Sequence, residues 1–597
     1  MVLAKQLECV AVSQCHSDYI AGHVHVSLNL AWYIPSSTFG CLKETLTMDK
    51  KVKSIFRKAW WVIPLCLGLV VIVFLWRRLS SDDKYTSVEP GDVVEGIVVI
   101  NGTAAIGTTD DDFICATLDW WPPEKCDYGT CSWGNASLFS LDLKNPRLIN
   151  AIKAFSPLKI RLGGTLQDKI IYEIPGYPCT ELTRNTSEMF GFTEGCLPLS
   201  RWDELNYFFN QTGAVVIFGL NALKGKSIRP DGSAVGRWDS TNAESLIRYS
   251  VDKGYTIHGW ELGNEVGGNA IGASISVDQY AQDTKKLHSL IHKIYADVAD
   301  KPIVLGPGGF FEKKWFERFI EKTEGSLEVV SHHIYNLGPG NDPDLMKKIL
   351  DPNFLSRGSE LFSDLQGILQ STGTSAVAWV GEAGGAYNSG HHKVTDTFAF
   401  SFWYLDQLGM ASTYDTKTYC RQSLIGGNYG LLETNTMEPN PDYYSALLWH
   451  RLMGRNVLFT SFLGFNKLRA YAHCSKAAKG ITVLLINLSQ DTTVHVYTPE
   501  NSGRDVAKTN QHDQTRRLKK STDDANTREE YHLTAKDGDL QSSRILLNGK
   551  QLTIGPTGRI PLLEPVKVNV FDPIVVAPFS IVFAQIASLS VPACSLS

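Results

Sequence analysis

The sequence has no excess of positive charge and lacks three common signatures of catalytic or metal sites. It has 57 lysine and arginine residues and 62 aspartate and glutamate residues, which gives a formal net charge of −5. Such a chain has no overall field to concentrate a polyanion, so we expect no nucleic-acid partner. It contains no Gly-x-Ser-x-Gly elbow, which argues against a serine esterase, and no H-E-x-x-H helix. Paired Cys-x-x-Cys spacing is also absent, so we expect no zinc site and no other cofactor.

What the sequence does have is the composition of a large globular protein. Its 597 residues exceed one ordinary core, which stops growing near ~250–300 residues, so we expect a large domain and a smaller one. Hydrophobic residues make up 43% and charged residues 20%, with 50 glycines. This balance is typical of a compact, loop-rich fold and not of a collagen, a coiled coil or a disordered chain. We expect the protein to be a monomer.

One long apolar run, Ala59–Trp76, contains no charged residue and has the length of a marginal membrane span. Basic residues are more frequent before it than after it, which places 1–58 in the cytoplasm by the positive-inside rule. We therefore predict a signal anchor followed by a linker over 77–92. A cleaved signal peptide is the alternative, although no A-x-A-like site follows the run. Met48 is an alternative start that would leave a short basic segment before the run.

Glycosylation sequons and cysteines agree with a luminal location for the rest of the chain. The acceptor asparagines of the sequons are Asn101, Asn135, Asn185, Asn210 and Asn487. Eight of the 12 cysteines also follow the apolar run, in a compartment that permits disulfides. Cys126 with Cys131, and Cys179 with Cys196, would close short loops, but connectivity stays open at this stage. We expect a secretory-pathway protein, either a type II membrane protein or one secreted to the extracellular space or cell wall, with the lysosome or vacuole as an alternative.

Between residues 93 and 440, short apolar runs alternate with amphipathic stretches, the pattern of repeated strand-helix units around a parallel sheet. The predicted strands are Phe113–Leu118, Leu158–Leu162, Ala214–Leu220, His258–Leu262, Pro302–Gly306, Val329–Ile334, Ala376–Gly381 and Met410–Tyr414. The predicted helices are Ala243–Lys253, Val277–Asp297, Trp315–Lys322, Ser359–Gln370 and Thr395–Leu408. Eight such strands predict an α/β fold, a closed (β/α)8 TIM barrel.

Residues 441–597 have a different character and predict an appended β-sandwich. Strand-like segments without helical periods are Val457–His473, Gly480–Asn487, Thr492–Tyr497, Arg544–Leu547 and Ile574–Gln585. Val93–Ile100 precedes the first barrel strand, and we expect it to join this sandwich. The polar interval 501–528 holds a basic cluster. We interpret it as a solvated loop, with a site for an anionic polymer as the alternative.

Two glutamates, Glu265 and Glu382, follow the predicted fourth and seventh strands. In a barrel of this type, catalytic groups lie on loops after the C-terminal ends of the strands, so both should face one pocket. Hydrolysis of a glycoside needs one carboxylic acid to protonate the leaving oxygen and one carboxylate to attack the sugar or activate water. We assign Glu265 as the general acid/base and Glu382 as the nucleophile. A separation of about 5–5.5 Å between the carboxyl groups would predict retention of configuration.

Two polar residues near these glutamates are candidates for a supporting role. Asn264 directly precedes Glu265 and could donate to a substrate hydroxyl beside the reacting carbon, although a capping residue is the alternative. Tyr335 follows the predicted sixth strand, where its hydroxyl could donate to Glu382 and keep that carboxylate ionised. Taken alone, Tyr335 would be interpreted as a core residue.

The sequence around these residues resembles the heparanase family of β-glucuronidases from about Val93 onward, and most of all its plant heparanase-like members. The matching segments begin at Phe113, Arg161, Tyr255, His332, Ser375 and Arg421. The run from Cys115 to Cys126, with its Trp-Trp-Pro-Pro-Glu-Lys stretch, and the run Tyr419-Cys420-Arg421-Gln422-Ser423 are especially specific.

The resemblance implies a retaining barrel enzyme with Glu265 as proton donor and Glu382 as nucleophile. It also implies that Asp119, Thr165 and Asn264 line the sugar site, and that Gly427 and Tyr429 meet the uronic carboxylate. Glycine-rich backbone can bring N–H groups close to an anion, although an ordinary turn is the alternative for this segment.

Two segments depart from the animal members of the family. The stretch 308–314 carries less positive charge than the basic clusters beside the animal cleft, which indicates a substrate other than heparan sulfate. The region Gln167–Arg201 is short where the animal enzyme loses a linker, so we expect an unprocessed single chain.

The leading interpretation is a β-glucuronidase acting on glucuronic-acid-bearing cell-wall or proteoglycan glycans, such as arabinogalactan side chains, in endo or exo mode. One alternative is an enzyme for small aromatic glucuronides, with Trp120, Trp121 and Tyr387 as the stacking surface. Another is a catalytically silent, glycan-binding surface protein.

Overall fold

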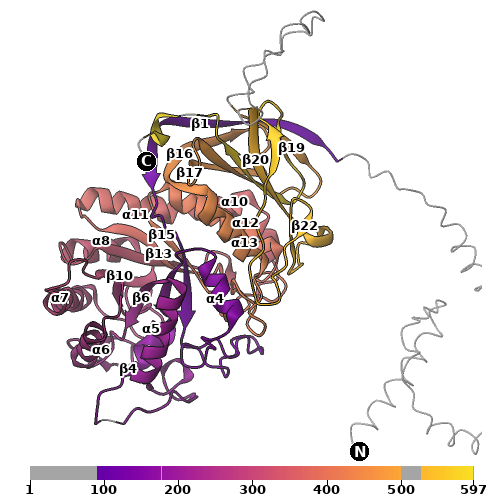
Figure 1. Cartoon of the computed structure of the whole chain (residues 1–597). Helices are drawn as coiled ribbons and strands as arrows, with labels where there is room; N and C mark the ends of the chain where they lie inside the picture. The colour runs from indigo at the N-terminus through magenta and orange to yellow at the C-terminus, as the bar shows by residue number, and fades with distance from the viewer. Residues whose placement is uncertain (1–90, 177, 499–525, 590, 596–597) are drawn as a thin grey trace, which may run out of the picture. The chain divides into compact units, whose positions relative to one another are not determined.

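The computed structural model describes residues 91–176, 178–498, 526–589 and 591–595 (Figure 1). The predicted anchor Ala59–Trp76, the alternative start Met48 and nearly all of the polar interval 501–528 lie outside these residues. Within the described ranges, no helix combines the length and apolar character that a membrane crossing requires.

Eight parallel strands form a closed barrel, as the sequence predicts (Figure 1). In chain order they are β2 (Ile114–Asp119), β3 (Lys159–Gly163), β6 (Val215–Leu220), β9 (Gly259–Leu262), β10 (Ile303–Phe310), β11 (Val329–Ile334), β13 (Val377–Ala383) and β15 (Thr418–Arg421). Each strand pairs in parallel with the next, and β15 pairs with β2 to close the ring. The predicted fourth and seventh strands are therefore β9 and β13.

The prediction for the eighth strand was wrong. Met410–Tyr414 lies at the C-terminal end of the helix α12 (Phe398–Thr413), and the strand is β15, a few residues later. α12 is buried on all sides because it packs between the barrel and the C-terminal sheet. Its sequence therefore lacks the helical alternation of apolar and polar residues, and such a segment cannot be distinguished from a buried strand by periodicity. The sequence of β15 is less apolar because it contains Arg421. The fold accommodates this buried side chain through an ion pair of 2.9 Å with Asp442.

Helices surround the barrel (Figure 1). Those of eight residues or more are α4 (Pro146–Lys153), α5 (Leu199–Thr212), α6 (Thr241–Asp252), α7 (Val277–Ile294), α8 (Lys313–Lys322), α11 (Ser359–Thr372), α12 and α13 (Pro441–Leu452). In α8 the buried residues are Phe316, Phe319 and Ile320, the i, i+3, i+4 spacing of a half-buried helix. The short helices are α9 (Leu345–Ile349) and α10 (Pro352–Ser356).

Three short strand pairs lie in the described loops around the barrel. They are β4 (Ile170–Tyr172) with β5 (Gly195–Leu197), β7 (Ser227–Ile228) with β8 (Ala234–Val235), and β12 (Gly338–Pro339) with β14 (Ala386–Tyr387). The last pair joins the loops that follow the sixth and seventh barrel strands, at the same end as Glu265 and Glu382.

A second sheet of eleven strands follows the barrel, in the order β22-β21-β20-β25-β18-β17-β16-β1-β19-β24 with β23 beside β20. Its strands are β1 (Val93–Thr108), β16 (Met453–Leu463), β17 (Leu468–Ser475), β18 (Ile481–Asn487), β19 (Thr493–Tyr497), β20 (Thr527–Ala535), β21 (Ile545–Leu547), β22 (Lys550–Gln551), β23 (Val566–Asn569), β24 (Ile574–Val576) and β25 (Ser580–Ile586). β1 pairs with β16 and β19, as expected for Val93–Ile100. β1 belongs to this sheet, and α13 packs against α12 of the barrel.

The sheet has two apolar faces, as expected for a sandwich. Residues of β18, β19, β24 and β25 share one hydrophobic cluster, while alternate residues of β18 and β25 join the cluster of the barrel. The contact with α12 is also polar: Arg469 on β17 forms an ion pair of 2.7 Å with Asp406, which accepts a hydrogen bond of 2.6 Å from the Tyr471 hydroxyl. The sheet thus covers and fixes the helices of the last barrel units.

All eight cysteines beyond the apolar run are paired. The two short loops, Cys126–Cys131 and Cys179–Cys196, are closed as the spacing suggested. Cys115–Cys420 joins the first and last strands of the barrel across 305 residues, and Cys474–Cys594 lies in the sheet domain. Four disulfides indicate a protein of the secretory pathway or the extracellular space.

The sequons differ in exposure. Asn101, Asn135, Asn185 and Asn210 are exposed. The prediction for Asn487 does not fit the fold, because this side chain is completely buried and its amide donates to the carbonyls of Thr492, Val576 and Ala577. A glycan would replace one of the two hydrogens on that nitrogen, so it would disrupt these hydrogen bonds and would require space inside the sheet domain.

Candidate active site

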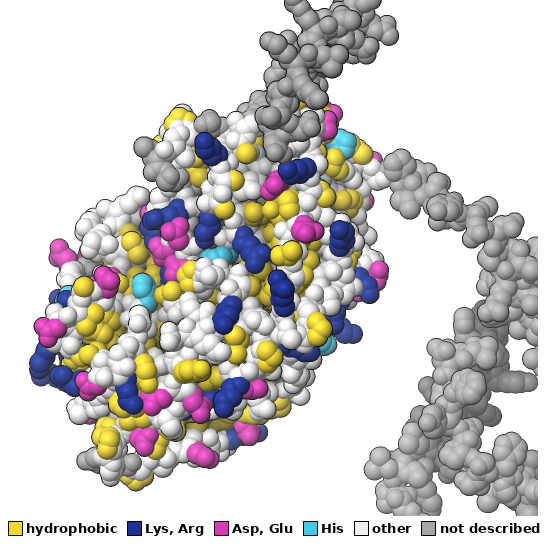
Figure 2. Space-filling view, in the orientation of Figure 1, with side chains coloured by type: hydrophobic (Ala, Val, Ile, Leu, Met, Phe, Trp, Pro, Cys, Tyr) yellow, Lys and Arg dark blue, Asp and Glu magenta, His cyan; other side chains and the backbone are white. Residues whose placement is uncertain are grey.

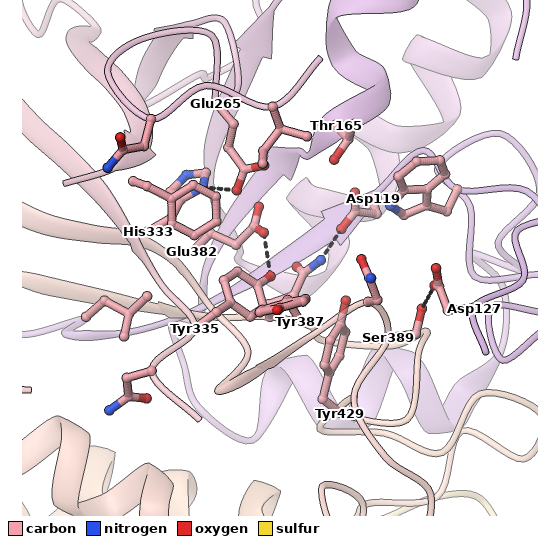
Figure 3. A pocket seen from close by; sticks show the side chains of 18 of the residues that line it. Asp119, Asp127, Thr165, Glu265, His333, Tyr335, Glu382, Tyr387, Ser389 and Tyr429 are labelled. Carbon is pink, nitrogen blue, oxygen red and sulfur yellow. Dashed lines mark hydrogen bonds and ion pairs between the residues drawn. The ribbon is translucent and has the colours of Figure 1, made fainter. Parts of the chain in front are cut away.

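A cavity of about 550 Å³ opens at the C-terminal end of the barrel strands. Six of the predicted site residues line it: Asp119, Thr165, Glu265, Tyr335, Glu382 and Tyr429. Figure 3 shows the carboxyl groups of Glu265 and Glu382 directed toward one another inside it. Asn264 and Gly427 are not part of the lining and act from behind it, as described below.

The two glutamates come from opposite sides of the barrel and meet closely. Glu382 is the sixth residue of β13, and Glu265 follows β9 with a positive φ of 55°. One carboxylate oxygen of each lies within 4.8 Å of the other. An inverting pair needs about 6.5–9.5 Å for an intervening water, whereas a retaining pair lies about 5–5.5 Å apart. This close approach of two oxygens agrees with a retaining pair.

Glu382 is surrounded by donors that stabilise its anionic form. The Tyr335 hydroxyl donates to Oε1 at 2.6 Å, as the sequence suggested, and Nη1 of Arg161 donates to Oε2 at 3.0 Å. Glu382, which accepts both hydrogen bonds, is only 5% exposed. The guanidinium and the hydroxyl stabilise negative charge on this buried carboxylate and hold it in one orientation, which suits a nucleophile.

Arg161 organises three groups of the site at once. Its Nε donates to Glu261 at 2.5 Å, its Nη1 to Glu382, and its Nη2 to Oδ1 of Asn264 at 2.9 Å. Asn264 is also fixed through its backbone N–H, which donates to Asp168 at 2.8 Å. Asn264 is therefore held in place directly behind the wall, with its Oδ1 already occupied.

Glu265 is also buried, with a side chain that is 8% exposed. Burial, partly offset by the Arg161 charge, raises the pKa of Glu265 to about 7. Nδ1 of His333 lies 2.9 Å from its Oε1. Burial also lowers the pKa of His333 to about 4, so this ring is neutral at physiological pH and can accept a hydrogen bond from the protonated carboxyl group of Glu265. Glu265 is thus a carboxyl group poised to give and take a proton near neutrality.

Asp119 and Tyr429 form the other side of the cavity. Oδ2 of Asp119 accepts from Nε2 of Gln422 at 2.6 Å, whereas Oδ1 is buried and has no hydrogen-bond partner among the described residues. Burial and then the Glu382 charge raise the pKa of Asp119. A free buried oxygen that faces a cavity fits a sugar hydroxyl as its partner. Gly427 supports Tyr429, because a Cβ at Gly427 would lie 2.7 Å from the tyrosine ring.

The loops after the first and seventh strands are tied together beside this region. The Ser389 hydroxyl donates to Asp127 at 2.5 Å and accepts from Nε1 of Trp133 at 2.9 Å. Nδ2 of Asn388 donates to the Tyr128 hydroxyl at 3.1 Å. We call this contact between residues 127–133 and 388–389 the loop bridge. Figure 3 shows Asp127 and Ser389 on the side of Asp119 and Tyr429, away from Glu265.

Of the three aromatic residues proposed as a stacking surface, two line the cavity. Trp121 and the half-exposed Tyr387 are part of the wall. Trp120 is not, because its side chain is completely buried and packs on Phe139 and Phe218. In a strand and its continuation successive side chains alternate, so only one of two adjacent tryptophans can face the cavity.

Sequence reasoning gave no role to Arg161, His333 or Gln422. A usable signal existed for two of them, since Arg161 interrupts the buried strand β3 and His333 the buried strand β11. A charged or polar residue in the wholly buried strand of a barrel needs a partner inside it. Gln422 follows directly after β15, where the strand prediction was wrong.

Glu265, His333 and Glu382 also have the composition of a metal site. The Arg161 guanidinium next to Glu382 argues against it, because a cation there would be repelled by a permanent positive charge 3.0 Å from one of its ligands. The geometry fits acid/base and nucleophilic chemistry by two carboxyl groups.

Residues 95–409 match the family model described as "Glycosyl hydrolase family 79, N-terminal domain". Heparanase-like protein 3 of Arabidopsis thaliana is 55% identical over 540 residues, which cover 89% of this chain and 99% of that protein. Baicalin-beta-D-glucuronidase of Scutellaria baicalensis is 42% identical over 543 residues, 88% of this chain and 96% of that protein. Heparanase of Rattus norvegicus is 28% identical over 489 residues, which cover 72% of this chain and 85% of that protein.

Among solved structures, a 4-O-alpha-L-rhamnosyl-beta-D-glucuronidase from Fusarium oxysporum superposes with a TM-score of 0.56 at 13% identity, covering 82% of this chain and all of that one. The GH51 alpha-L-arabinofuranosidase of Thermotoga petrophila gives a TM-score of 0.54 at 13% identity, with 82% and 99% covered. At such low identity these likenesses bear on the fold alone.

Proposed function

Because the chain belongs to glycosyl hydrolase family 79, we propose that it cleaves β-glucuronosyl linkages with retention of configuration, with Glu382 as nucleophile and Glu265 as acid/base. The protein is a glycoside hydrolase of the β-glucuronidase and heparanase type. The observation that carries the two roles is the contrast between the glutamates. Their oxygens lie within 4.8 Å, yet Glu382 accepts hydrogen bonds from Arg161 and Tyr335 while burial raises the pKa of Glu265 to about 7.

In the first step, a carboxylate oxygen of Glu382 attacks the anomeric carbon. The bond from that carbon to the aglycone oxygen breaks, and Glu265 donates its proton to this oxygen, which leaves as an alcohol. In the second step, the Glu265 carboxylate takes a proton from water as the water oxygen attacks the anomeric carbon. The ester bond to Glu382 breaks, and both side chains return to their starting protonation states.

The positions of the two glutamates orient the substrate. The acid must face the leaving group, so the aglycone lies on the Glu265 side, near Ile271, whose N–H donates to the Glu265 carbonyl, and near Phe310, whose ring contacts His333. The glucuronosyl group lies on the side of Asp119 and Tyr429. The predicted contact of Gly427 with the uronic carboxylate is then indirect, through the position of the Tyr429 ring.

The loop bridge supports action on terminal glucuronosyl groups. It joins the loops after the first and seventh strands next to the position proposed for the sugar, with Ser389 only 4% exposed between Asp127 and Trp133. A longer chain extending from the non-reducing side of the sugar would have to displace it. We therefore favour exo action on glucuronic acid at chain ends of cell-wall or proteoglycan glycans such as arabinogalactan, in the secretory pathway or outside the cell.

A second candidate function is hydrolysis of small aromatic glucuronides. Trp121, Phe310 and Tyr387 line the cavity and provide apolar surface for an aryl aglycone. A relative that covers nearly the whole chain is named for such a substrate, baicalin. Competition between an aryl glucuronide and a glucuronic-acid-bearing arabinogalactan, at equal concentrations, would rank the two classes by kcat/KM.

The test of the proposed function is hydrolysis of a chromogenic β-glucuronide, with the β-glucoside as control and Glu382→Gln as the inactive variant. Release from the glucuronide alone, abolished in the variant, supports the proposal. Proton NMR at early times should show the β-anomer of glucuronic acid as the first product, since two displacements preserve configuration. Absence of release from every glucuronide, together with glycan binding, would favour the catalytically silent binder instead.

A further inference from the structure

A second cluster of ligating side chains lies at the opposite end of the barrel from the catalytic glutamates. α7 carries His288 and His292, which are one helical turn apart, and Glu328 directly precedes β11. One ring nitrogen of each histidine and one carboxylate oxygen of Glu328 all lie within 4.8 Å of one another. From this convergence we infer that His288, His292 and Glu328 form a binding site for a divalent transition-metal ion, with Zn²⁺ as the reference ion.

The chemistry of the three donors fits this ion. Two imidazoles and one carboxylate are a common zinc ligand set, in which water takes the fourth tetrahedral position. Zinc bonds of about 2.0–2.2 Å place neighbouring ligand atoms about 3.3–3.5 Å apart. Nε2 of His288 lies 3.6 Å from Oε1 of Glu328, which is close to that spacing and longer than a hydrogen bond. The two imidazole rings are also near each other, with centroids 4.1 Å apart.

Rigid elements hold the ligands in place. The histidines lie near the end of an 18-residue helix. Oε2 of Glu328 accepts from the backbone N–H of Val304 at 2.8 Å, and the Glu328 N–H donates to the Val304 carbonyl at 3.1 Å. The carboxylate is therefore tied to β10 through one oxygen and presents the other to His288. Such an outer hydrogen bond orients a metal ligand before the ion arrives.

The cluster remains accessible from solvent, since the side chain of Glu328 is 40% exposed and that of His288 is 19% exposed.

The location separates this site from catalysis. Glu328 stands before the first residue of β11, whereas His333 and Tyr335, at the other end of the same strand, belong to the active site. In barrels of this type the C-terminal end carries the chemistry, and the N-terminal end contributes to stability. A bound ion would join α7 to the start of β11 and stabilise the fold without entering the reaction.

The experiment is calorimetric titration of Zn²⁺ into the full-length protein after removal of metal with EDTA. We expect the wild type to bind one more zinc ion per chain than His288→Ala or His292→Ala, and Glu328→Gln to weaken the same site at least about tenfold. Zinc should raise the Tm of the wild type by a few degrees and leave the Tm of the histidine variants unchanged. Hydrolysis of the chromogenic glucuronide should be the same with and without EDTA.

The matched control is His392→Ala, which removes a 71% exposed histidine from another part of the surface. It should bind zinc as the wild type does, which separates this cluster from histidines elsewhere in the chain. Retained glucuronide hydrolysis in each variant reports that the barrel is folded. Equal zinc stoichiometry in the wild type and in a His288→Ala/His292→Ala double variant would overturn the proposal, as would unchanged Tm values at saturating zinc.

Discussion

Nη1 of Arg161 lies 3.0 Å from Oε2 of Glu382, and both side chains are buried in the barrel. The same guanidinium also binds Glu261 and Asn264, so one residue of the second strand fixes groups that lie on or just after the fourth and seventh strands. The planar fork of arginine can reach three acceptors in fixed directions, which a lysine cannot do. The orientation of the proposed nucleophile therefore depends on the position of a residue that need not touch the substrate.

Arg161→Lys should keep a positive charge but lose the fork. We expect kcat/KM for the chromogenic glucuronide to fall by at least about 100-fold, because the loss of one charge-assisted hydrogen bond in a buried site costs about 1.5–3 kcal/mol and several are lost here. Steady-state kinetics measures the effect, and circular dichroism checks the fold. Arg161→Met should in addition lower stability by about 3–5 kcal/mol, because it leaves two buried carboxylates unpaired. A fully active lysine variant would contradict this role.

Tyr335→Phe should remove one donor to Glu382 and leave the shape of the site intact. We expect kcat/KM to fall by about 10–100-fold with little change in Tm, since hydrogen bonds to charged groups contribute about 1.5–3 kcal/mol. The matched control is Tyr255→Phe, which loses a hydroxyl bonded to Asp203 at 2.7 Å away from the cavity. Equal kinetics for both variants would argue that the Tyr335 hydroxyl plays no part in the reaction.

The rate should depend on the protonation of Glu265. Because burial raises its pKa to about 7, the carboxyl group is protonated and can act as the acid below that pH. We expect kcat/KM to be high in the acidic range and to fall about tenfold per pH unit above 7. Glu265→Gln should lose this limb and should retain more activity on aryl glucuronides with good leaving groups than on alkyl ones. An optimum above pH 8 in the wild type would contradict the assignment.

The same group predicts a trend in stability. The folded pKa of Glu265 is higher than the value of 4.5 for an unperturbed glutamate, so the folded state binds this proton more tightly than the unfolded state. Its contribution to stability is complete below about pH 4.5 and is lost as the pH rises to about 7. Glu265→Gln should therefore flatten the change in Tm over this range, which thermal unfolding at several pH values would measure.

The Cys115–Cys420 disulfide should stabilise the closure of the barrel, because it joins the first and eighth strands across 305 residues. The double variant Cys115→Ala/Cys420→Ala should lose about 2–5 kcal/mol in denaturant unfolding. Cys126→Ala/Cys131→Ala serves as the control, since its disulfide spans five residues and constrains the unfolded chain less. A smaller loss for the first pair than for the second would contradict this expectation.

Opening the loop bridge should relax the preference for chain ends. Ser389→Ala removes the hydrogen bonds to Asp127 and Trp133. We expect this variant to gain activity, relative to the wild type, on oligosaccharides in which the glucuronic acid carries a further sugar, with chromogenic glucuronide hydrolysis changed by less than about threefold. Product analysis by mass spectrometry measures the shift. Cleavage of such internal units by the wild type at a comparable rate would contradict exo action.

The sequence by itself determined the repeated strand-helix pattern, the appended strand-rich domain and the two glutamates proposed as catalytic. Short, mainly apolar runs predict barrel strands because both faces of each strand are buried. This signal does not depend on which strands become neighbours in the barrel. Glu265 and Glu382 stand directly at the ends of such runs, where this architecture exposes side chains to the mouth. The approximate location of the site therefore follows from local pattern and chain order.

Only the tertiary structure decided which other residues complete the site and which strand closes the barrel. Arg161, His333 and Glu382 come from the second, sixth and seventh strands, so their contacts depend on the register and curvature of the ring. Asn487 satisfies a sequon but is buried by strands that are distant in sequence. α12 resembled a strand in part because the C-terminal sheet covers the face that an ordinary barrel helix would expose to water. Each of these outcomes depends on burial between segments far apart in the chain, which a local pattern does not encode.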